Sequence, residues 1–339
     1  MLSDYEFKVS DKVKNKFIKT INYFSECTDN IIEQVREAEK AGLSSVWFGQ
    51  HLVTGPIQML QMMPLLARII PECGDMLIGS GVVLLAMQNP VRIAEEMATL
   101  DWLSDGKLIV GAGIGYRHEE FEVTGINIRT RGKRFEEALQ IVRQCWQSDK
   151  IHFKGKHFSI GNQIPSLKPK QLNGPPIWIA GEVEPSIKRA ALMGDAWLPL
   201  PVPNRATLIQ LLDIFRSERA KLGLSQVKEQ PLMREVYIGE NNTSAFAECE
   251  SPLYDKYKAY ADWGQSESSS SNDEFSQDFR NFSNDRFLIG DTTSVADNIK
   301  RYRDELCIDH LICRVQWPGL SQEQVLSTIR RLGKCRAKL

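Results

Sequence analysis

The sequence lacks an excess of charge of either sign and lacks any long apolar run. Its 339 residues include 42 Lys and Arg against 43 Asp and Glu. A nearly neutral chain gives no electrostatic reason to expect nucleic acid or an anionic membrane as a partner. No apolar stretch approaches the roughly 20 residues that span a bilayer, and residues 1–16 lack the apolar core of a secretory signal. We therefore expect a cytoplasmic protein.

The sequence also lacks paired cysteines. Its seven cysteines are dispersed along the chain, and none forms a Cys-x-x-Cys pair. An odd, scattered set in a chain of this length favours reduced thiols over a disulfide framework or a zinc site. The composition therefore predicts neither disulfides nor a metal centre.

A strand–loop–helix unit is present instead, and it repeats along the chain. Short apolar runs alternate with segments whose apolar residues recur at helical spacing. One helix start is well marked, because Asn89 suits the N-cap and Pro90 the first helical position. The predicted strands lie at 17–24, 45–48, 77–85, 107–110, 176–180, 195–198, 234–238 and 310–315.

Continuous apolar strands that alternate with helices predict a parallel sheet buried on both faces. A single closed (β/α)8 barrel of the TIM type, with insertions, accounts for the length. An open doubly wound sheet with a separate cap domain is the alternative. We expect one domain over residues 1–339, with insertions at about 150–175 and at 264–285. The second insertion is serine-rich, and we predict a mobile loop near the barrel mouth.

Residues 107–121, KLIVGAGIGYRHEEF, contain three alternating glycines at the end of an apolar strand. The alternation of Gly111, Gly113 and Gly115 predicts that large side chains are excluded on one face, by a flat ligand or by close packing. The pattern is not a dinucleotide-binding fingerprint, because the third glycine comes one residue early and no apolar helix follows. From these residues alone, a ligand site and a tight packing site are equally open.

Five segments, in order along the chain, resemble the bacterial luciferase-like superfamily of flavin-dependent oxidoreductases. They are residues 41–51, 78–126, 131–146, 175–199 and 287–320. The resemblance implies a TIM-like barrel, a homodimer, and a flavin bound at the carboxyl ends of the strands. The superfamily includes FMN-dependent monooxygenases as well as deazaflavin (F420) dehydrogenases and reductases.

The resemblance also implies a cofactor site. Gly81-Val82 falls where the superfamily often has a non-proline cis peptide in a bulged strand, against which the flavin ring packs. The turn at 181–186 falls where the cofactor phosphate binds, and free N–H groups at a helix start favour an anion. The residues expected to bind the cofactor are Gly81, Val82, Gly113, Gly115, Tyr116, Arg117, Gly181, Glu182 and Ser186.

The 181–186 turn departs from the family pattern. It lacks the second glycine that is common there, and it places Glu182 and Glu184 close to the expected phosphate. We expect Arg117 to offset this negative charge by reaching over the turn. An ordinary capped helix is the alternative for this segment considered alone.

His51 is the expected catalytic residue. The resemblance places it near the reactive edge of the flavin, where the family often carries an acid–histidine pair. Imidazole titrates near neutral pH and can therefore exchange a proton there. Because the preceding residue is Gln50 and not an acid, we expect a backbone carbonyl or the substrate to orient His51. The alternative is a strand-end histidine that only bonds backbone.

These features together predict an FMN-dependent monooxygenase of the two-component type. Reduced FMN, supplied by a separate flavin reductase, would activate O₂ in a pocket that excludes water. The apolar residues of the segment 52–64 favour a small, partly hydrophobic organic substrate. The alternatives are an F420-dependent dehydrogenase or reductase that transfers hydride, and a non-catalytic flavin-binding protein.

Overall fold

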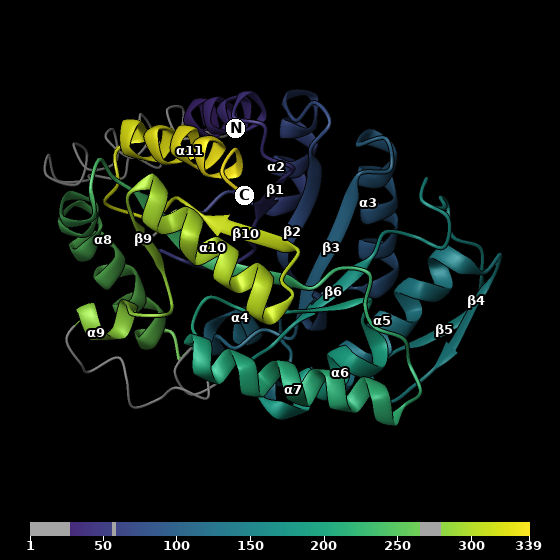
Figure 1. Ribbon diagram of the computed structural model, residues 1–339. Coiled ribbons are helices and arrows are strands. Elements are labelled where there is room, and N and C mark those ends of the chain that lie inside the picture. The colour runs from purple at the N-terminus through teal and green to yellow at the C-terminus, as the bar shows by residue number, and fades with distance from the viewer. Residues whose placement is uncertain (1–27, 56–58, 265–278) are drawn as a thin grey trace, which may run out of the picture.

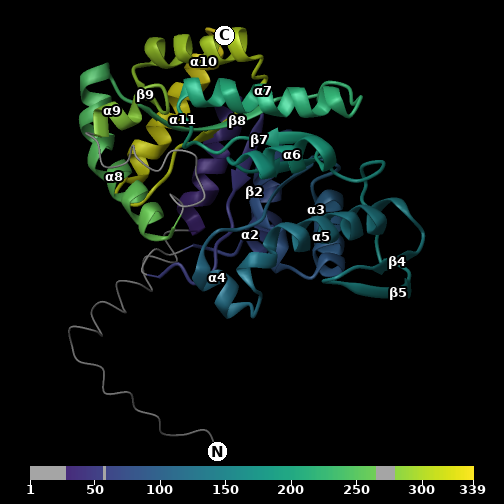
Figure 2. The same ribbon diagram turned by 90° about the horizontal axis from the view of Figure 1, so that it is seen from below.

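The computed structural model describes residues 28–55, 59–264 and 279–339 (Figure 1). The strand predicted at 17–24 and most of the serine-rich insertion, residues 265–278, lie outside the described residues. Helices surround the central strands in both views (Figures 1 and 2). The layers are those of an α/β protein.

The central strands form two parallel sheets. The first sheet has the order β1 (Ser45–Phe48), β2 (Leu77–Leu84), β3 (Leu108–Gly113), β6 (Ile177–Ala180) and β7 (Ala196–Leu198). The second sheet has the order β10 (His310–Arg314), β8 (Pro231–Ile238) and β9 (Leu288–Gly290). Each strand of these two sheets other than the short β9 overlaps a predicted run, and its ends lie within three residues of that run.

Contacts join the two sheets at two places. Beyond β7, the Met233 N–H of β8 donates to the Pro199 carbonyl oxygen at 3.3 Å. The His310 Nε2 atom at the start of β10 lies 3.0 Å from the Ser45 Oγ atom at the start of β1. Parallel strands that alternate with helices in this way are those of a TIM-type barrel, which confirms the predicted fold class.

Helices cover the outside of the barrel, and the local sequence explains how they begin. The Asn89 Oδ1 atom accepts from the N–H groups of Val91 and Arg92 at 3.1 Å, and Pro90 is the first helical residue, as predicted. The described helices are residues 28–40, α2 (Met62–Ile69), α3 (Pro90–Leu103), α4 (His118–Val123), α5 (Arg131–Gln147), α6 (Glu184–Met193), α7 (Arg205–Lys221), α8 (Asn242–Asp262), α9 (Phe279–Ser283), α10 (Thr292–Leu306) and α11 (Gln322–Arg336).

The two insertions contain more regular structure than the sequence indicated. Residues 150–175 begin with an antiparallel hairpin, β4 (Ile151–Lys154) and β5 (Ser159–Gln163), on the opposite side of the molecule from α8 and α9 (Figures 1 and 2). The end of the second insertion forms α9, and Phe279 and Phe282 are buried there. This part of the insertion is therefore not a loop, because two phenylalanines anchor it by apolar burial.

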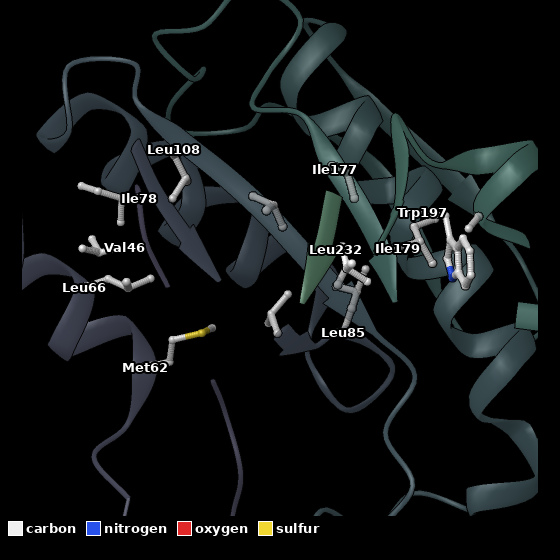
Figure 3. Packing of buried hydrophobic residues seen from close by; sticks show 14 of the residues in the cluster. Val46, Met62, Leu66, Ile78, Leu85, Leu108, Ile177, Ile179, Trp197 and Leu232 are labelled. Carbon is white, nitrogen blue, oxygen red and sulfur yellow. The ribbon is translucent and has the colours of Figure 1, made fainter. Parts of the chain in front are cut away.

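The core fills the space between the strands and the helices. Figure 3 shows Val46, Ile78 and Leu66 lying together in the layer between the sheet and α2. Trp178 and Trp197 are buried. The six cysteines among the described residues are free thiols. No described helix is long and apolar enough to cross a membrane.

Protein atoms crowd two of the alternating glycines. A Cβ atom added at Gly111 would lie 2.1 Å from the Ser80 carbonyl oxygen, and one at Gly113 would lie 2.8 Å from the Val82 Cγ2 atom. Both contacts join β3 to the irregular part of β2. Close packing against β2 therefore explains why these two positions are glycine. A Gly113→Val substitution would disturb this packing as well as the binding of any ligand nearby.

We expect Gly111→Ala to lower the free energy of unfolding by about 2–4 kcal/mol, because its Cβ would meet a backbone oxygen that cannot move aside. Chemical denaturation measures the change. Gly161→Ala in β5 is the matched control, since a Cβ there meets no atom within 4 Å, and its effect should stay within about 0.5 kcal/mol. Equal effects of the two substitutions would contradict the packing account.

Candidate active site at the mouth of the barrel

The carboxyl ends of β1, β2 and β3 lie at one edge of the barrel, where TIM-type enzymes assemble their sites. His51 follows β1, and Tyr116 follows β3. The Gly81-Val82 peptide of β2 is cis. The register between β2 and β3 shifts between Ser80 and Val83, so the predicted cis bond and the predicted bulge are both confirmed.

A buried carboxylate orients His51. The His51 Nδ1 atom lies 2.8 Å from the Oε1 atom of Glu120, whose side chain is fully buried. The same oxygen accepts the N–H of Leu52 at 2.9 Å. A carboxylate oxygen accepts hydrogen bonds, so the His51 Nδ1–H donates to Glu120, and Nε2 is the ring nitrogen left to exchange a proton. The prediction that a backbone carbonyl or the substrate orients His51 is wrong, because Glu120 reaches it from the next strand but one.

The helical phase of α4 selects Glu120 for this role. Glu119 and Glu120 both lie in the first turn, where negative charge is favourable. The Glu119 side chain is 57% exposed, whereas that of Glu120 points inward and is 0% exposed. Gln50, which stands where the family often has an acid, has a different role: its Oε1 atom accepts the Leu84 N–H at 3.0 Å. Gln50 thus ties the His51 loop to the end of β2.

Arg117 lies beside His51 and not over the 181–186 turn. Its Nη1 atom donates to the Leu52 carbonyl oxygen at 2.7 Å, and its guanidinium lies 4.2 Å from the centre of the Trp263 ring. The Glu120 carboxylate is 3.8 Å away. These contacts hold the Arg117 side chain against the loop after β1, and Arg117 is only 3% exposed. The expectation that it offsets the acidic residues of the turn is therefore corrected.

Three aromatic side chains lie in a row beside His51. Tyr116 packs edge-on against His51 with ring centres 5.9 Å apart, and the centre of the Trp263 ring lies 5.7 Å from that of the imidazole. Tyr260 follows at 5.5 Å from Trp263. We call these four half-exposed side chains, His51, Tyr116, Trp263 and Tyr260, the mouth wall. Burial raises the pKa of Tyr116, so its phenol stays protonated at neutral pH.

The end of α8 contributes two wall residues, Tyr260 and Trp263, that were not predicted from the sequence. Tyr257, Tyr260 and Trp263 recur every three residues, a spacing that places them along one face of a helix. That spacing was the available signal. The turn before Tyr116 also depends on the local sequence, because Gly115 has a φ of +77°, which favours glycine.

The turn at 181–186 meets one requirement of an anion site. Val183 caps α6 without a side-chain hydrogen bond. Pro185 has no N–H, and the Ser186 N–H donates to the Val183 carbonyl oxygen at 2.8 Å, so the first turn offers at most the Glu184 N–H to another acceptor. Glu184 is exposed and pairs with Lys188 at 2.7 Å, which removes part of the expected repulsion. Glu182 opposes a phosphate, because it is only 3% exposed and lies directly before the cap. Gly181, Glu182 and Ser186 therefore stay predicted cofactor contacts.

The chain is similar in sequence to proteins of one known family. The model of the luciferase-like monooxygenase family matches residues 19–309. The chain belongs to this family. It is 24% identical over 226 residues to the oxygenase component of a flavin-dependent trigonelline monooxygenase from Acinetobacter baylyi, which covers 64% of this chain and 61% of that protein. The chain matches between 46% and 61% of the length of such curated relatives.

Solved structures agree on the fold of this luciferase-like chain. The monooxygenase RslO1 from Streptomyces bottropensis superposes with a TM-score of 0.79 at 19% identity, over 92% of this chain and 93% of that one. An F420-dependent secondary alcohol dehydrogenase in complex with an F420–acetone adduct gives 0.74 at 20% identity, over 91% and 94%. Monooxygenases and F420 enzymes thus share this fold, and the fold does not distinguish them.

We expect Glu120→Ala to lower the free energy of unfolding by about 2–4 kcal/mol, because it leaves the buried Leu52 N–H and Arg117 without their carboxylate. Glu119→Ala is the matched control, since that neighbouring side chain is exposed, and it should change stability by no more than about 0.5 kcal/mol. Urea denaturation of both variants checks this. A Glu120 effect no larger than that of Glu119 would remove Glu120 as the anchor of the loop.

Proposed function

We propose that this protein is the oxygenase component of a two-component monooxygenase, which uses reduced FMN and O₂ to oxygenate a small, partly hydrophobic organic substrate. The observation that carries the proposal is the His51–Glu120 pair. It provides a proton-exchanging group with a fixed tautomer, beside a bulged strand at the catalytic edge of a luciferase-like barrel.

The residues at this edge fit a flavin. The bulge at Gly81-Val82 and the strand end from Gly113 to Arg117 would border the ring, next to the half-exposed rings of the mouth wall. The turn at 181–186 would lie near the phosphate, with the Glu184 N–H and the Ser186 hydroxyl as its donors and with Glu182 opposing it. When bound, the reduced flavin supplies electrons and activates O₂.

The side chains of the chain itself have distinct roles in this proposal. His51 gives or takes a proton at Nε2, and Glu120 holds the ring and stabilises it when it becomes charged. Arg117 keeps the loop after β1 in place through the Leu52 carbonyl oxygen. The aromatic wall excludes water and orients the apolar part of the substrate.

Similarity to relatives supports the two-component reading and also the alternative. One relative is named as the oxygenase component of a flavin-dependent monooxygenase, a name that favours a separate flavin reductase as partner. Another, 31% identical over 179 residues, is an F420-dependent hydroxymycolic acid dehydrogenase from Mycobacterium tuberculosis. Hydride transfer with F420 is therefore the second candidate, and a non-catalytic flavin-binding protein the third. The homodimer stays a prediction.

Oxygen consumption distinguishes these candidates. With photoreduced FMN and a set of small organic substrates, we expect substrate-dependent product formation that incorporates oxygen from O₂. A parallel titration with F420 should show weaker binding than the titration with FMN. Tight F420 binding with anaerobic hydride transfer would favour the dehydrogenase, and flavin binding without turnover of any substrate would favour the non-catalytic protein.

Replacing His51 should separate proton transfer from cofactor binding. We expect His51→Ala to lower turnover by about 10²–10⁴-fold, the usual span for a general acid or base, with FMN affinity nearly unchanged. Glu120→Gln should lower turnover by about 10-fold to 10³-fold, because the neutral amide no longer stabilises the charged imidazole.

His118→Ala is the matched control, because this histidine is exposed and lies two residues from Glu120. Turnover and FMN affinity are measured on one preparation of each variant. Turnover of His51→Ala within a few-fold of the parent would make His51 a structural residue. Lost FMN affinity in that variant would make it a cofactor ligand.

A further inference from the structure

A second buried charged group lies beside the mouth wall. Glu235 of β8 is fully buried, and the Lys256 Nζ atom of α8 donates to both of its carboxylate oxygens at 2.9 and 2.8 Å. The Tyr257 hydroxyl donates to the same carboxylate at 3.1 Å. The Nη1 atom of Arg314 lies 3.2 Å from Glu235 Oε1. We call Glu235, Lys256 and Arg314 the charged triad.

The charged triad carries one carboxylate against two cations. Although burial opposes it, the charges of Arg314 and Lys256 lower the pKa of Glu235, so the carboxylate is ionised. Burial, and then the charge of Arg314, lower the pKa of Lys256, as expected where two cations share one partner. Within the described residues, no other carboxylate contacts either cation. The charged triad therefore carries one positive charge in excess, which favours an anion nearby.

The positive excess faces the mouth of the barrel. Arg314 is the last residue of β10 and therefore lies at the same edge as His51. Its side chain is 28% exposed, whereas that of Lys256 is 4% exposed. The Arg314 Nη2 atom donates to the Tyr260 hydroxyl oxygen at 2.7 Å. Since that oxygen accepts from the guanidinium, the Tyr260 hydroxyl hydrogen is available to donate to a ligand.

We infer that Arg314 and Tyr260 form an anion subsite that binds the carboxylate of the substrate, so that the substrate is a small, partly apolar carboxylic acid. The guanidinium fork and a phenol hydroxyl suit a planar carboxylate. The rings of Trp263 and Tyr116 then contact the apolar part and direct it toward His51. The inference rests on the proposed function for the position of the flavin, but the subsite itself can be tested by binding alone.

The test compares an acid with its neutral amide on the flavin-free protein. Tryptophan fluorescence, to which Trp263 contributes, is titrated with benzoate and with benzamide. We expect benzoate to bind at least about tenfold more tightly than benzamide, as one charge-assisted contact allows. Hexanoate and hexanamide repeat the comparison without an aromatic ring. Equal affinity of acid and amide in both pairs would overturn the inference.

Substitution of Arg314 locates the preference. Arg314→Gln should abolish the preference for benzoate, and the variant should fold because Lys256 still neutralises Glu235. Arg301→Gln is the matched control, since Arg301 is a half-exposed arginine of α10, and it should keep the preference. Tyr260→Phe keeps the ring and the triad but removes the hydroxyl, and it should weaken benzoate binding by about 3–10-fold. Unchanged benzoate binding in Arg314→Gln would overturn the inference.

A third experiment tests whether Arg314 binds the carboxylate of a substrate or the phosphate of the cofactor. The affinities of FMN and riboflavin are compared in the parent and in Arg314→Gln. We expect the ratio of the two affinities to stay unchanged, whereas a selective loss of FMN affinity would assign Arg314 to the phosphate and overturn the substrate assignment. A protein that binds benzoate through Arg314 but does not oxygenate with reduced FMN would contradict the proposed function and leave the subsite standing.

Discussion

One buried carboxylate joins two strand ends at the mouth of this barrel. Glu120, at the start of α4 after β3, accepts hydrogen bonds from both His51 and the Leu52 N–H in the loop after β1. Because a buried carboxylate must keep its partners, this contact fixes the path of the loop, the tautomer of the imidazole and the place of Arg117 together. The remaining side chains of the mouth are arranged around that fixed point.

The mouth wall connects two regions of different charge. At one end, the positive charge of Arg117 and the negative charge of Glu120 offset each other beside His51, an arrangement suited to proton exchange. At the other end, the charged triad leaves a positive excess next to Tyr260. A ligand that lies along the aromatic rings would therefore meet a proton-exchanging group at one end and a cationic group at the other.

The longer strands of the barrel could be predicted from the sequence, because each carries its own apolar run. The helix α8 was not predicted. The strand β9 was missed as well, since the three residues of Leu288–Gly290 are too few to show a pattern. The family resemblance located His51 and the Gly81-Val82 cis bond. The role of Glu120 could not be predicted, because the sequence does not distinguish it from the neighbouring Glu119. Only the orientation of the six-residue helix α4 shows which of the two side chains is buried. Contacts across 69 residues, such as His51 with Glu120, cannot be read from local spacing.

The glycines of β3, Gly111 and Gly113, illustrate the same limit of local sequence patterns. Their alternation correctly indicated an excluded face, but on the Cβ side the excluding atoms belong to β2 and not to a ligand. A local pattern therefore reported that space was restricted, and only the fold showed what restricts it.

We propose that the His51–Glu120 pair lies at the reactive edge of a bound flavin, and a crystal structure with FMN would test this. We expect the isoalloxazine ring to pack against the Gly81-Val82 bulge, with His51 Nε2 within hydrogen-bond reach of the ring edge or of a substrate beside it. A flavin bound elsewhere, or a ring whose reactive edge faces away from His51 while Glu120 still holds the imidazole, would contradict the proposed role of the pair.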